Sequence, residues 1–210
     1  MKIRKYLKIH ICSVTFFLFF LSIHVQAAFI LSFDSSPNSW VGQGDSRFVT
    51  PGDGYDFSVR TNFDNGLSFS IERDAPYGDP LRDWWTLELA APFGDLLTVG
   101  LYEDATRWPF QADDAPGLTF SGNHRGNNRN LGFFEVLEAT YDSLGALESF
   151  AVDFTQYGEQ NLDRWIVGQL RYNSEVPLNV PEPGTLLLLF IGLFGLTIAS
   201  TRTRSALSPL

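Results

Sequence analysis

Apolar and polar residues alternate one by one along much of the chain between residues 28 and 176. Residues 55–59 and 67–71 each place apolar side chains on one face of an extended strand and polar side chains on the other. Asp64-Asn65-Gly66 separates the two runs, and two alternating runs joined by an Asn-Gly turn are typical of a β-hairpin. This middle region has no helical stripe of about ten or more residues, so the pattern predicts an all-β domain.

One stretch, residues 133–141, is ambiguous, because its sequence also fits two helical turns. The turn at 142–145 and the clear strand pattern at 147–155 favour a strand. About nine short strands with one solvent-facing side each predict two packed antiparallel sheets, so we expect a single antiparallel β-sandwich. The other expected strands are 84–89, 97–103, 118–121 and 165–172.

The N-terminus has the three zones of a secretory signal peptide. Four basic residues in the first eight positions precede an apolar stretch at 9–23, and Val25-Gln26-Ala27 supplies small residues for a signal peptidase. We expect cleavage after Ala27, which leaves Ala28 as the new N-terminus. The alternative is an uncleaved membrane anchor, for which the apolar run is short.

The C-terminus combines a proline-rich junction with a second apolar run. Pro181-Glu182-Pro183 precedes residues 185–201, which carry no charge and are just long enough for a short transmembrane helix. Arg202 and Arg204 follow, and these cations favour a cytoplasmic C-terminus with the domain outside. The prolines mark an extended junction that cannot belong to the helix.

This combination resembles the PEP-CTERM sorting signal of Gram-negative bacteria. The resemblance implies that the tail anchors the chain transiently in a membrane, that an exosortase processes it, and that the protein belongs near exopolysaccharide. A plain C-terminal anchor is the alternative. The implied organisation is a signal peptide at 1–27, a β-sandwich domain at 28–176, and a sorting tail at 177–210 with a transmembrane helix at 185–201.

A second resemblance runs through the middle of the chain. It rests on residues 39–44, 92–106, 120–126, 150–157 and 168–174, which are similar to a bacterial extracytoplasmic module of unassigned function. This resemblance implies a fold and no activity. Its relatives carry cysteines at the places of Asn127 and Gly158, and the joint absence of both suggests a lost disulfide rather than a lost metal site.

The middle of the chain is strongly acidic. Six of the 15 basic residues lie at the two ends, which leaves nine arginines against 24 acidic residues. Such a surface repels phosphate backbones and argues against nucleic-acid binding, while it tolerates cations and neutral glycans. The only cysteine is Cys12, within the signal peptide, so the mature domain has no thiol or disulfide.

No catalytic motif stands out, and we expect no enzyme. A Ser-His-acid triad needs a histidine, and the mature domain has only His124, in a polar loop without a G-x-S-x-G elbow. The many carboxylates keep an extracellular carboxylate-dependent hydrolase as the alternative, although nothing marks one pair.

Calcium is the one cofactor that the acidic turns suggest. Asp45, Asp53 with Asp56, and Asp113-Asp114 lie in turn sequences that offer oxygen ligands, but without the spacing of an EF-hand. The alternative is that each aspartate caps its own turn.

The tryptophans give the best indication of binding. Adjacent Trp84 and Trp85 must face opposite sides of a strand, so one can join the core while the other needs a cover or a ligand. An exposed indole can stack on the apolar face of a sugar ring, and Trp108, in a loop, is a second candidate. The alternative is that both candidates pack under neighbouring loops.

Taken with the sorting tail, these residues predict an exported protein of the cell surface or extracellular matrix with a binding or structural role. Exopolysaccharide is the expected contact. A hydrolase and a self-associating structural protein are the alternatives.

Overall fold

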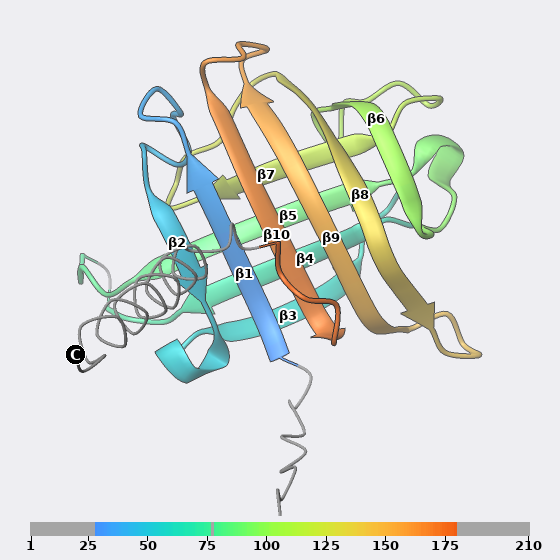
Figure 1. The fold of residues 1–210 in the computed structure, drawn as a ribbon, viewed down its shortest axis with the longest axis horizontal. Coiled ribbons are helices and arrows are strands. Elements are labelled where there is room, and N and C mark those ends of the chain that lie inside the picture. The colour runs from blue at the N-terminus through green and yellow to red at the C-terminus, as the bar shows by residue number, and fades with distance from the viewer. Residues whose placement is uncertain (1–27, 77, 180–210) are drawn as a thin grey trace, which may run out of the picture.

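The computed structural model describes residues 28–76 and 78–179, and this part of the chain is all-β, as predicted (Figure 1). Two short 3-10 turns, η1 (Pro51–Asp53) and η2 (Pro92–Gly94), interrupt the strands, and no helix in the described ranges has the length and apolarity to cross a membrane. The expected signal helix and the expected transmembrane helix at 185–201 lie outside the described residues. The strands are β1 (Ala28–Ser35), β2 (Ser46–Val49), β3 (Asp56–Thr61), β4 (Leu67–Arg73), β5 (Asp83–Ala90), β6 (Gly100–Thr106), β7 (Gly117–Gly122), β8 (Asn130–Tyr141), β9 (Leu147–Gly158) and β10 (Trp165–Ser174).

The strands follow one continuous hydrogen-bonded order, β2-β1-β10-β9-β8-β6-β7-β5-β4-β3. This sheet curls into two layers, with β1, β10, β9 and β8 in front and β3, β4, β5 and β7 crossing behind them (Figure 1). The layers join at β6 and β7, which pair in parallel at Thr106 and Gly117. The two packed faces of the expected sandwich are therefore present. They belong to one curled sheet with a parallel junction, rather than to two separate antiparallel sheets.

The alternating apolar residues of both layers meet in one aromatic core. Phe69 of β4 stacks on Phe150 of β9 across the layers, with the ring centroids 5.5 Å apart. Trp85 lies parallel to Phe120 at 5.4 Å and contacts Phe33 of the front layer at 4.7 Å. Because rings of this size bury a large apolar area, this cluster supplies much of the stability of a domain that has no disulfide.

The predicted hairpin is confirmed, since β3 and β4 pair from Thr61 with Leu67 onward. Asn62 closes its turn by accepting hydrogen bonds from the backbone N–H groups of Asp64 and Gly66, at 3.1 and 2.9 Å. The ambiguous stretch at 133–141 is a strand, as expected, within β8. The strand expected at 97–103 begins three residues later, at Gly100 of β6. Leu97 precedes it in a loop, from which its side chain is buried in the core.

Side chains complete the edge of β7 where the sheet changes layer. The buried Gln156 of β9 accepts a hydrogen bond from the backbone N–H of Phe120 and donates one to its carbonyl oxygen. Asn130 of β8 donates to the carbonyl oxygen of Leu118 at 3.2 Å. These amides take the place of a neighbouring strand, so the polar backbone of β7 stays paired inside the core.

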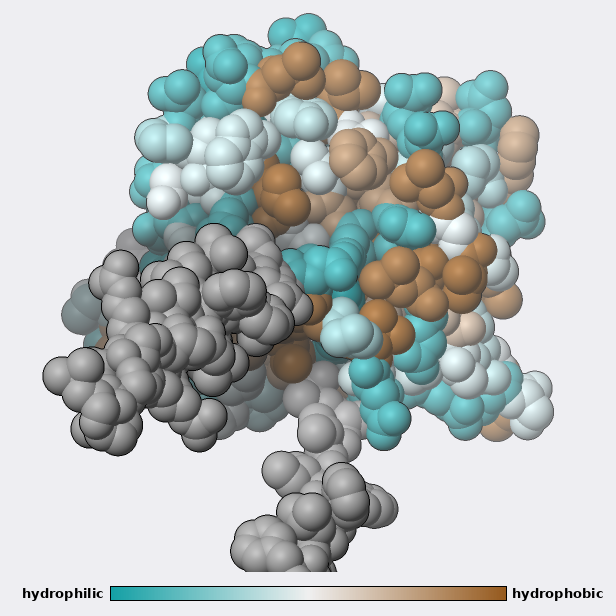
Figure 2. All heavy atoms as spheres, viewed as in Figure 1, coloured by the Kyte–Doolittle hydropathy of each residue, from teal (hydrophilic) through white to brown (hydrophobic). Residues whose placement is uncertain are grey.

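The outer face of the front layer mixes apolar and polar residues, as the brown and teal areas of Figure 2 show. The register places Val167 of β10 and Phe133 of β8 on either side of Thr155 of β9. Both apolar side chains are more than 40% exposed, at 46% and 42%. Exposed apolar side chains of this kind are ordinary on folded domains. A groove lies on the other layer.

Candidate functional site

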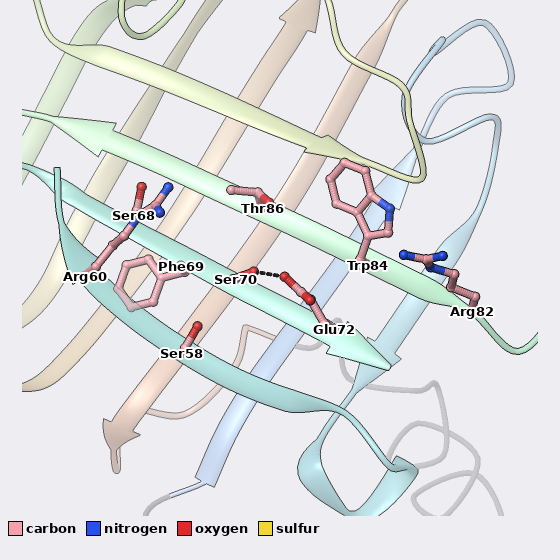
Figure 3. Close-up of a pocket in the computed structure, with 9 residues that line it drawn as sticks. All are labelled: Ser58, Arg60, Ser68, Phe69, Ser70, Glu72, Arg82, Trp84 and Thr86. Carbon is pink, nitrogen blue, oxygen red and sulfur yellow. Dashed lines mark hydrogen bonds between the residues drawn. The ribbon is translucent and has the colours of Figure 1, made fainter. Parts of the chain in front are cut away.

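A groove runs over the outer face of the back layer, across β3, β4 and β5 (Figure 3). Its volume is about 580 Å³. It exists because the residues that alternate with the core are small and hydroxylated along two neighbouring strands, while a large side chain stands at one end. The lining residues are Ser58, Arg60, Ser68, Phe69, Ser70, Glu72, Arg82, Trp84 and Thr86.

The two adjacent tryptophans face opposite sides of β5, as the sequence predicts. Trp85 is fully buried against Phe120, whereas Trp84 is half-buried on the outer face and lines one end of the groove. Its ring leans from β5 toward β7 (Figure 3). The His124 ring meets Trp84 edge-on, with the centroids 5.7 Å apart and an interplanar angle of 85°. His124 thus supports one side of the half-buried indole.

The start of β5 is held firmly under Trp84. The backbone N–H of Trp84 donates to Asn123 Oδ1 at 3.0 Å, and Asn123 Nδ2 donates to Asp83 Oδ1 at 2.5 Å. The buried Asp83 also accepts a hydrogen bond from the Tyr55 hydroxyl. This network fixes the backbone that carries the indole, so Trp84 is presented from a rigid strand rather than from a loop.

The electrostatics of this network follow from burial and hydrogen bonding. Burial together with the hydrogen bond to Asp83 raises the pKa of Tyr55 to about 12. Burial alone would raise the pKa of Asp83, but the hydrogen bonds from Tyr55 and Asn123 outweigh it and lower that pKa. At neutral pH the phenol is therefore protonated and Asp83 is ionised.

Two carboxylates lie on the groove face. Ser70 donates to Glu72 at 2.5 Å, and Ser68 donates to the buried Glu88, which lies 4.0 Å from Arg60. Burial raises the pKa of Glu88, while the hydrogen bond from Ser68 and the charge of Arg60 oppose that rise. The face therefore offers carboxylate acceptors, guanidinium donors and hydroxyls around one indole, which suits a ligand that is rich in hydroxyl groups.

Trp108 lies elsewhere, in the loop before β7. Its Nε1 donates to Asp64 Oδ2 at 2.9 Å, and its ring contacts Phe63 at 5.2 Å. Trp108 is half-buried and braces this loop against the β3–β4 turn. The structure therefore brings neither Trp85 nor Trp108 to the groove of Trp84.

The acidic turns have local partners. Asp45 pairs with Arg47 at 2.9 Å, and Asp53 accepts hydrogen bonds from the backbone N–H and the hydroxyl of Thr50. Within residues 28–76 and 78–179 no group of three potential metal ligands comes together. Asp53 therefore caps its own turn, whereas Asp45 is held in an ion pair with Arg47.

The hydroxylated residues of the groove were not predicted from the sequence. Ser68 and Ser70 alternate with core residues on β4, and Ser58 of β3 and Thr86 of β5 lie on either side of Ser70. Serines that alternate with core residues are typical of any solvent-facing side of a strand, so they do not by themselves indicate a site. The one signal that was available is that two neighbouring strands both carry small hydroxylated residues opposite an outward tryptophan.

The two positions linked to a lost disulfide are neighbours in space. A Cβ atom built on Gly158 would lie 2.8 Å from the amide atoms of Asn127 and 2.9 Å from its Cγ. Asn127 fills the space that a side chain at position 158 would take.

The comparison with protein families finds the PEP-CTERM protein-sorting motif at residues 179–204. The match contains Pro181, Glu182 and Pro183, which lie outside the described residues, as does Ala27 of the expected cleavage site. Ala28 is the first residue of β1. No curated protein and no solved structure matches the chain.

Proposed function

We propose that this PEP-CTERM protein, which is exported and then processed at its C-terminus by an exosortase at the cell envelope, contacts neutral glycan through the Trp84 groove. The observation that carries the proposal is the outward indole of Trp84 in a groove lined by hydroxylated side chains. The tail would tether the protein to the membrane before processing, and the groove would hold it in exopolysaccharide afterwards.

The groove suits a pyranose ring on physical grounds. The flat apolar face of the indole complements the axial C–H groups of a sugar, while Ser58, Ser70 and Thr86 can exchange hydrogen bonds with its hydroxyls. Arg82 lies beside Trp84 at the same end of the groove (Figure 3). An open groove of this kind gives weak contacts that gain strength along a repeating polymer.

The charge of the protein favours a neutral glycan. Residues 28–176 carry nine arginines against 23 acidic residues, so the domain as a whole repels a polyanion at long range. A neutral glycan carries no charge, so the acidic domain does not repel it.

We favour binding over hydrolysis, because both groove carboxylates already have partners on this face. Ser70 donates to Glu72. Ser68 donates to Glu88, which also lies 4.0 Å from Arg60.

The test is retention of the full chain in the matrix of a host that makes exopolysaccharide. Trp84→Ala should move most of the protein from the matrix to the medium. Trp40→Ala is the matched control, because Trp40 is 57% exposed and lies outside the groove. Equal retention of Trp84→Ala and the wild type would refute the proposal, and loss confined to Trp40→Ala would move the binding site to another face.

A further inference from the structure

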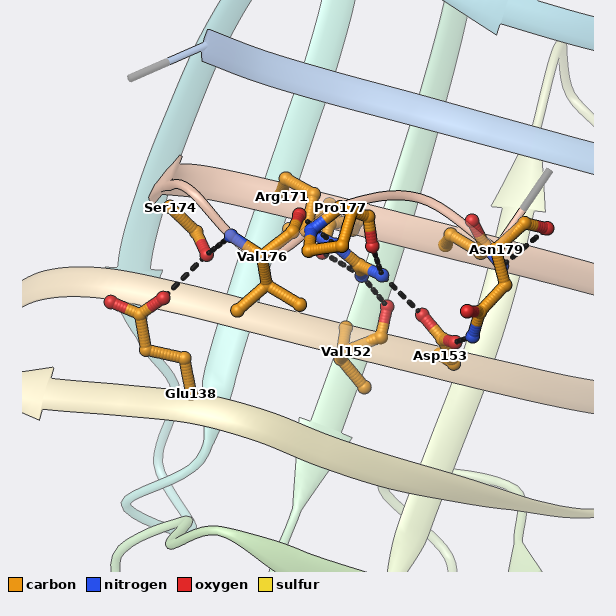
Figure 4. Close-up of polar contacts among 10 residues, drawn as sticks. Glu138, Val152, Asp153, Arg171, Ser174, Val176, Pro177 and Asn179 are labelled. Carbon is orange, nitrogen blue, oxygen red and sulfur yellow. Dashed lines mark hydrogen bonds and ion pairs between the residues drawn. The ribbon is translucent and has the colours of Figure 1, made fainter. Parts of the chain in front are cut away.

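A buried arginine lies on the outer face of the front layer, just before the sorting tail (Figure 4). Arg171 of β10 is 1% exposed and forms an ion pair with Asp153 of β9 at 2.8 Å. Its Nη1 donates to the carbonyl oxygen of Val152 at 2.9 Å. Its Nε and Nη2 donate to the carbonyl oxygens of Val176 and Pro177, each at 3.1 Å.

Further contacts hold the same segment, residues 175–179, which we call the strap. Asn179 Nδ2 donates to the second carboxylate oxygen of Asp153 at 2.8 Å, and Gln169 Nε2 donates to the carbonyl oxygen of Asn179 at 3.4 Å. At its other end, the backbone N–H of Val176 donates to Ser174 Oγ at 3.1 Å. Figure 4 shows the strap lying over the strands, with the arginine between it and Asp153.

The burial of Arg171 depends on the strap. A buried guanidinium is costly unless its donors are paired, and two of the acceptors of Arg171 are strap carbonyls. If the strap left, those donors would face the sheet surface without partners from the chain. The arginine and the strap therefore stabilise each other's position, and charge-assisted hydrogen bonds make this contact stronger than ordinary loop packing.

The strap ends where the sorting motif begins. Asn179, its last residue, is also the first residue that the PEP-CTERM match covers. Peptide-bond cleavage requires a segment whose backbone is free to enter an active site, and the strap backbone is bound to the domain. The domain boundary expected at residue 176 thus lies inside a segment that packs on the domain as far as Asn179.

We infer that Arg171 and Asp153 form a clamp that sets the upstream limit of processing. The clamp protects the peptide bonds of the strap, so the sorting tail is cut downstream of Asn179 and the released protein keeps its strap docked on β9 and β10. Arg171 is a positioning residue here: it determines which bonds are available and does not take part in the cleavage.

The test is the intact mass of the released protein after the full chain has been processed by its host. Wild type should end at one position at or beyond Asn179. Arg171→Met keeps the apolar stem but removes the donors, and should raise the fraction of chains that end within 175–179 at least tenfold. Asn179→Ala frees only the end of the strap and should yield a smaller fraction, cut next to residue 179.

Asn173→Ala is the matched control, because the Asn173 side chain donates to the Glu148 carbonyl oxygen rather than to the strap. It should leave the termini as in wild type. Wild-type protein that ends within 175–179 would overturn the inference, as would Arg171→Met or Asn179→Ala protein with unchanged termini. If Arg171→Met fails to accumulate, the termini of Asn179→Ala decide, since that variant keeps the buried ion pair.

Discussion

The side-chain amide of Gln156 pairs with both backbone groups of Phe120, at 2.7 Å for the N–H and 3.0 Å for the carbonyl. Gln156 is fully buried and belongs to the front layer, whereas Phe120 belongs to the back layer. One side chain thus provides the backbone pairing that β6, which meets β7 at a single position, does not provide. The Gln156 side chain therefore keeps the backbone of β7 paired at the junction of the two layers.

Replacing Gln156 with Leu should destabilise the domain strongly, because the N–H and C=O groups of Phe120 would stay buried without partners. Each unsatisfied group costs about 1–3 kcal/mol, so the free energy of unfolding should fall by about 2–6 kcal/mol. Urea unfolding of residues 28–179 measures this change. Gln160→Leu, at an exposed position, is the control, and a loss below about 0.5 kcal/mol for Gln156→Leu would contradict the account.

The sequence predicted those parts of the fold that depend on local period. Alternation and the Asn-Gly turn sufficed for the β3–β4 hairpin, and the adjacency of Trp84 and Trp85 sufficed to place one indole inside and the other outside. The curl of the sheet could not be predicted from the sequence. The hydrogen bond between Gln156 and Phe120 at the layer junction is long-range, and a buried glutamine in a strand leaves no periodic pattern.

For the sites too, local features could be predicted from the sequence and long-range contacts could not. The direction of Trp84 could be predicted, but its companions could not, because Ser58 and Thr86 reach the groove through strand register rather than sequence spacing. Trp108 looked like a loop residue free to bind, yet Asp64 takes its indole N–H. The clamp of Arg171 could not be predicted from the sequence either. An arginine at an outward position of a strand is normally solvent-exposed, whereas Arg171 is buried.

A disulfide should form between cysteines placed at positions 127 and 158. The Cγ atom of Asn127 lies 2.9 Å from a Cβ on Gly158, so the two Cβ atoms would be at most about 4.4 Å apart, within the range of about 3.5–4.5 Å that disulfides use. Gly158 does not have a left-handed backbone, so a side chain there adds no backbone strain. We expect the oxidised double variant to be about 2–4 kcal/mol more stable than its reduced form.

Thiol titration and unfolding with and without reductant check this prediction. The only natural cysteine is Cys12, so residues 28–179 carry no competing thiol. Asn127→Cys alone is the control and should respond little to reductant. Two free thiols in the folded double variant under air would contradict the geometry.

Stability should fall at alkaline pH through Tyr55. Its folded pKa of about 12 exceeds the ordinary value of 10.0, so its contribution is complete below pH 10 and is lost as the pH rises through 12. A rise in pKa from 10.0 to about 12 corresponds to about 2–3 kcal/mol. Chemical unfolding at pH 8, 10 and 12 should show this loss in wild type. Tyr55→Phe should lack that part of the loss, and an identical alkaline profile for both proteins would contradict the assignment.

The acid side should depend on Asp83, whose folded pKa is lowered because the hydrogen bonds from Tyr55 and Asn123 outweigh its burial. Its contribution is present above the ordinary pKa and is lost as the pH falls through the folded value. Asp83→Asn should therefore flatten the decline in unfolding free energy below about pH 4. Asp74→Asn, at an exposed position, should leave that decline unchanged, and equal steepness in wild type and Asp83→Asn would count against the network.

Calorimetric titration of residues 28–179 with neutral oligosaccharides cut from the host's exopolysaccharide tests glycan binding in the Trp84 groove most directly. We predict saturable heat for wild type and for Trp40→Ala. Loss of a buried aromatic contact of about 2 kcal/mol should make Trp84→Ala bind roughly thirtyfold more weakly. Absence of heat with wild type, or equal affinities for wild type and Trp84→Ala, would contradict glycan binding in this groove.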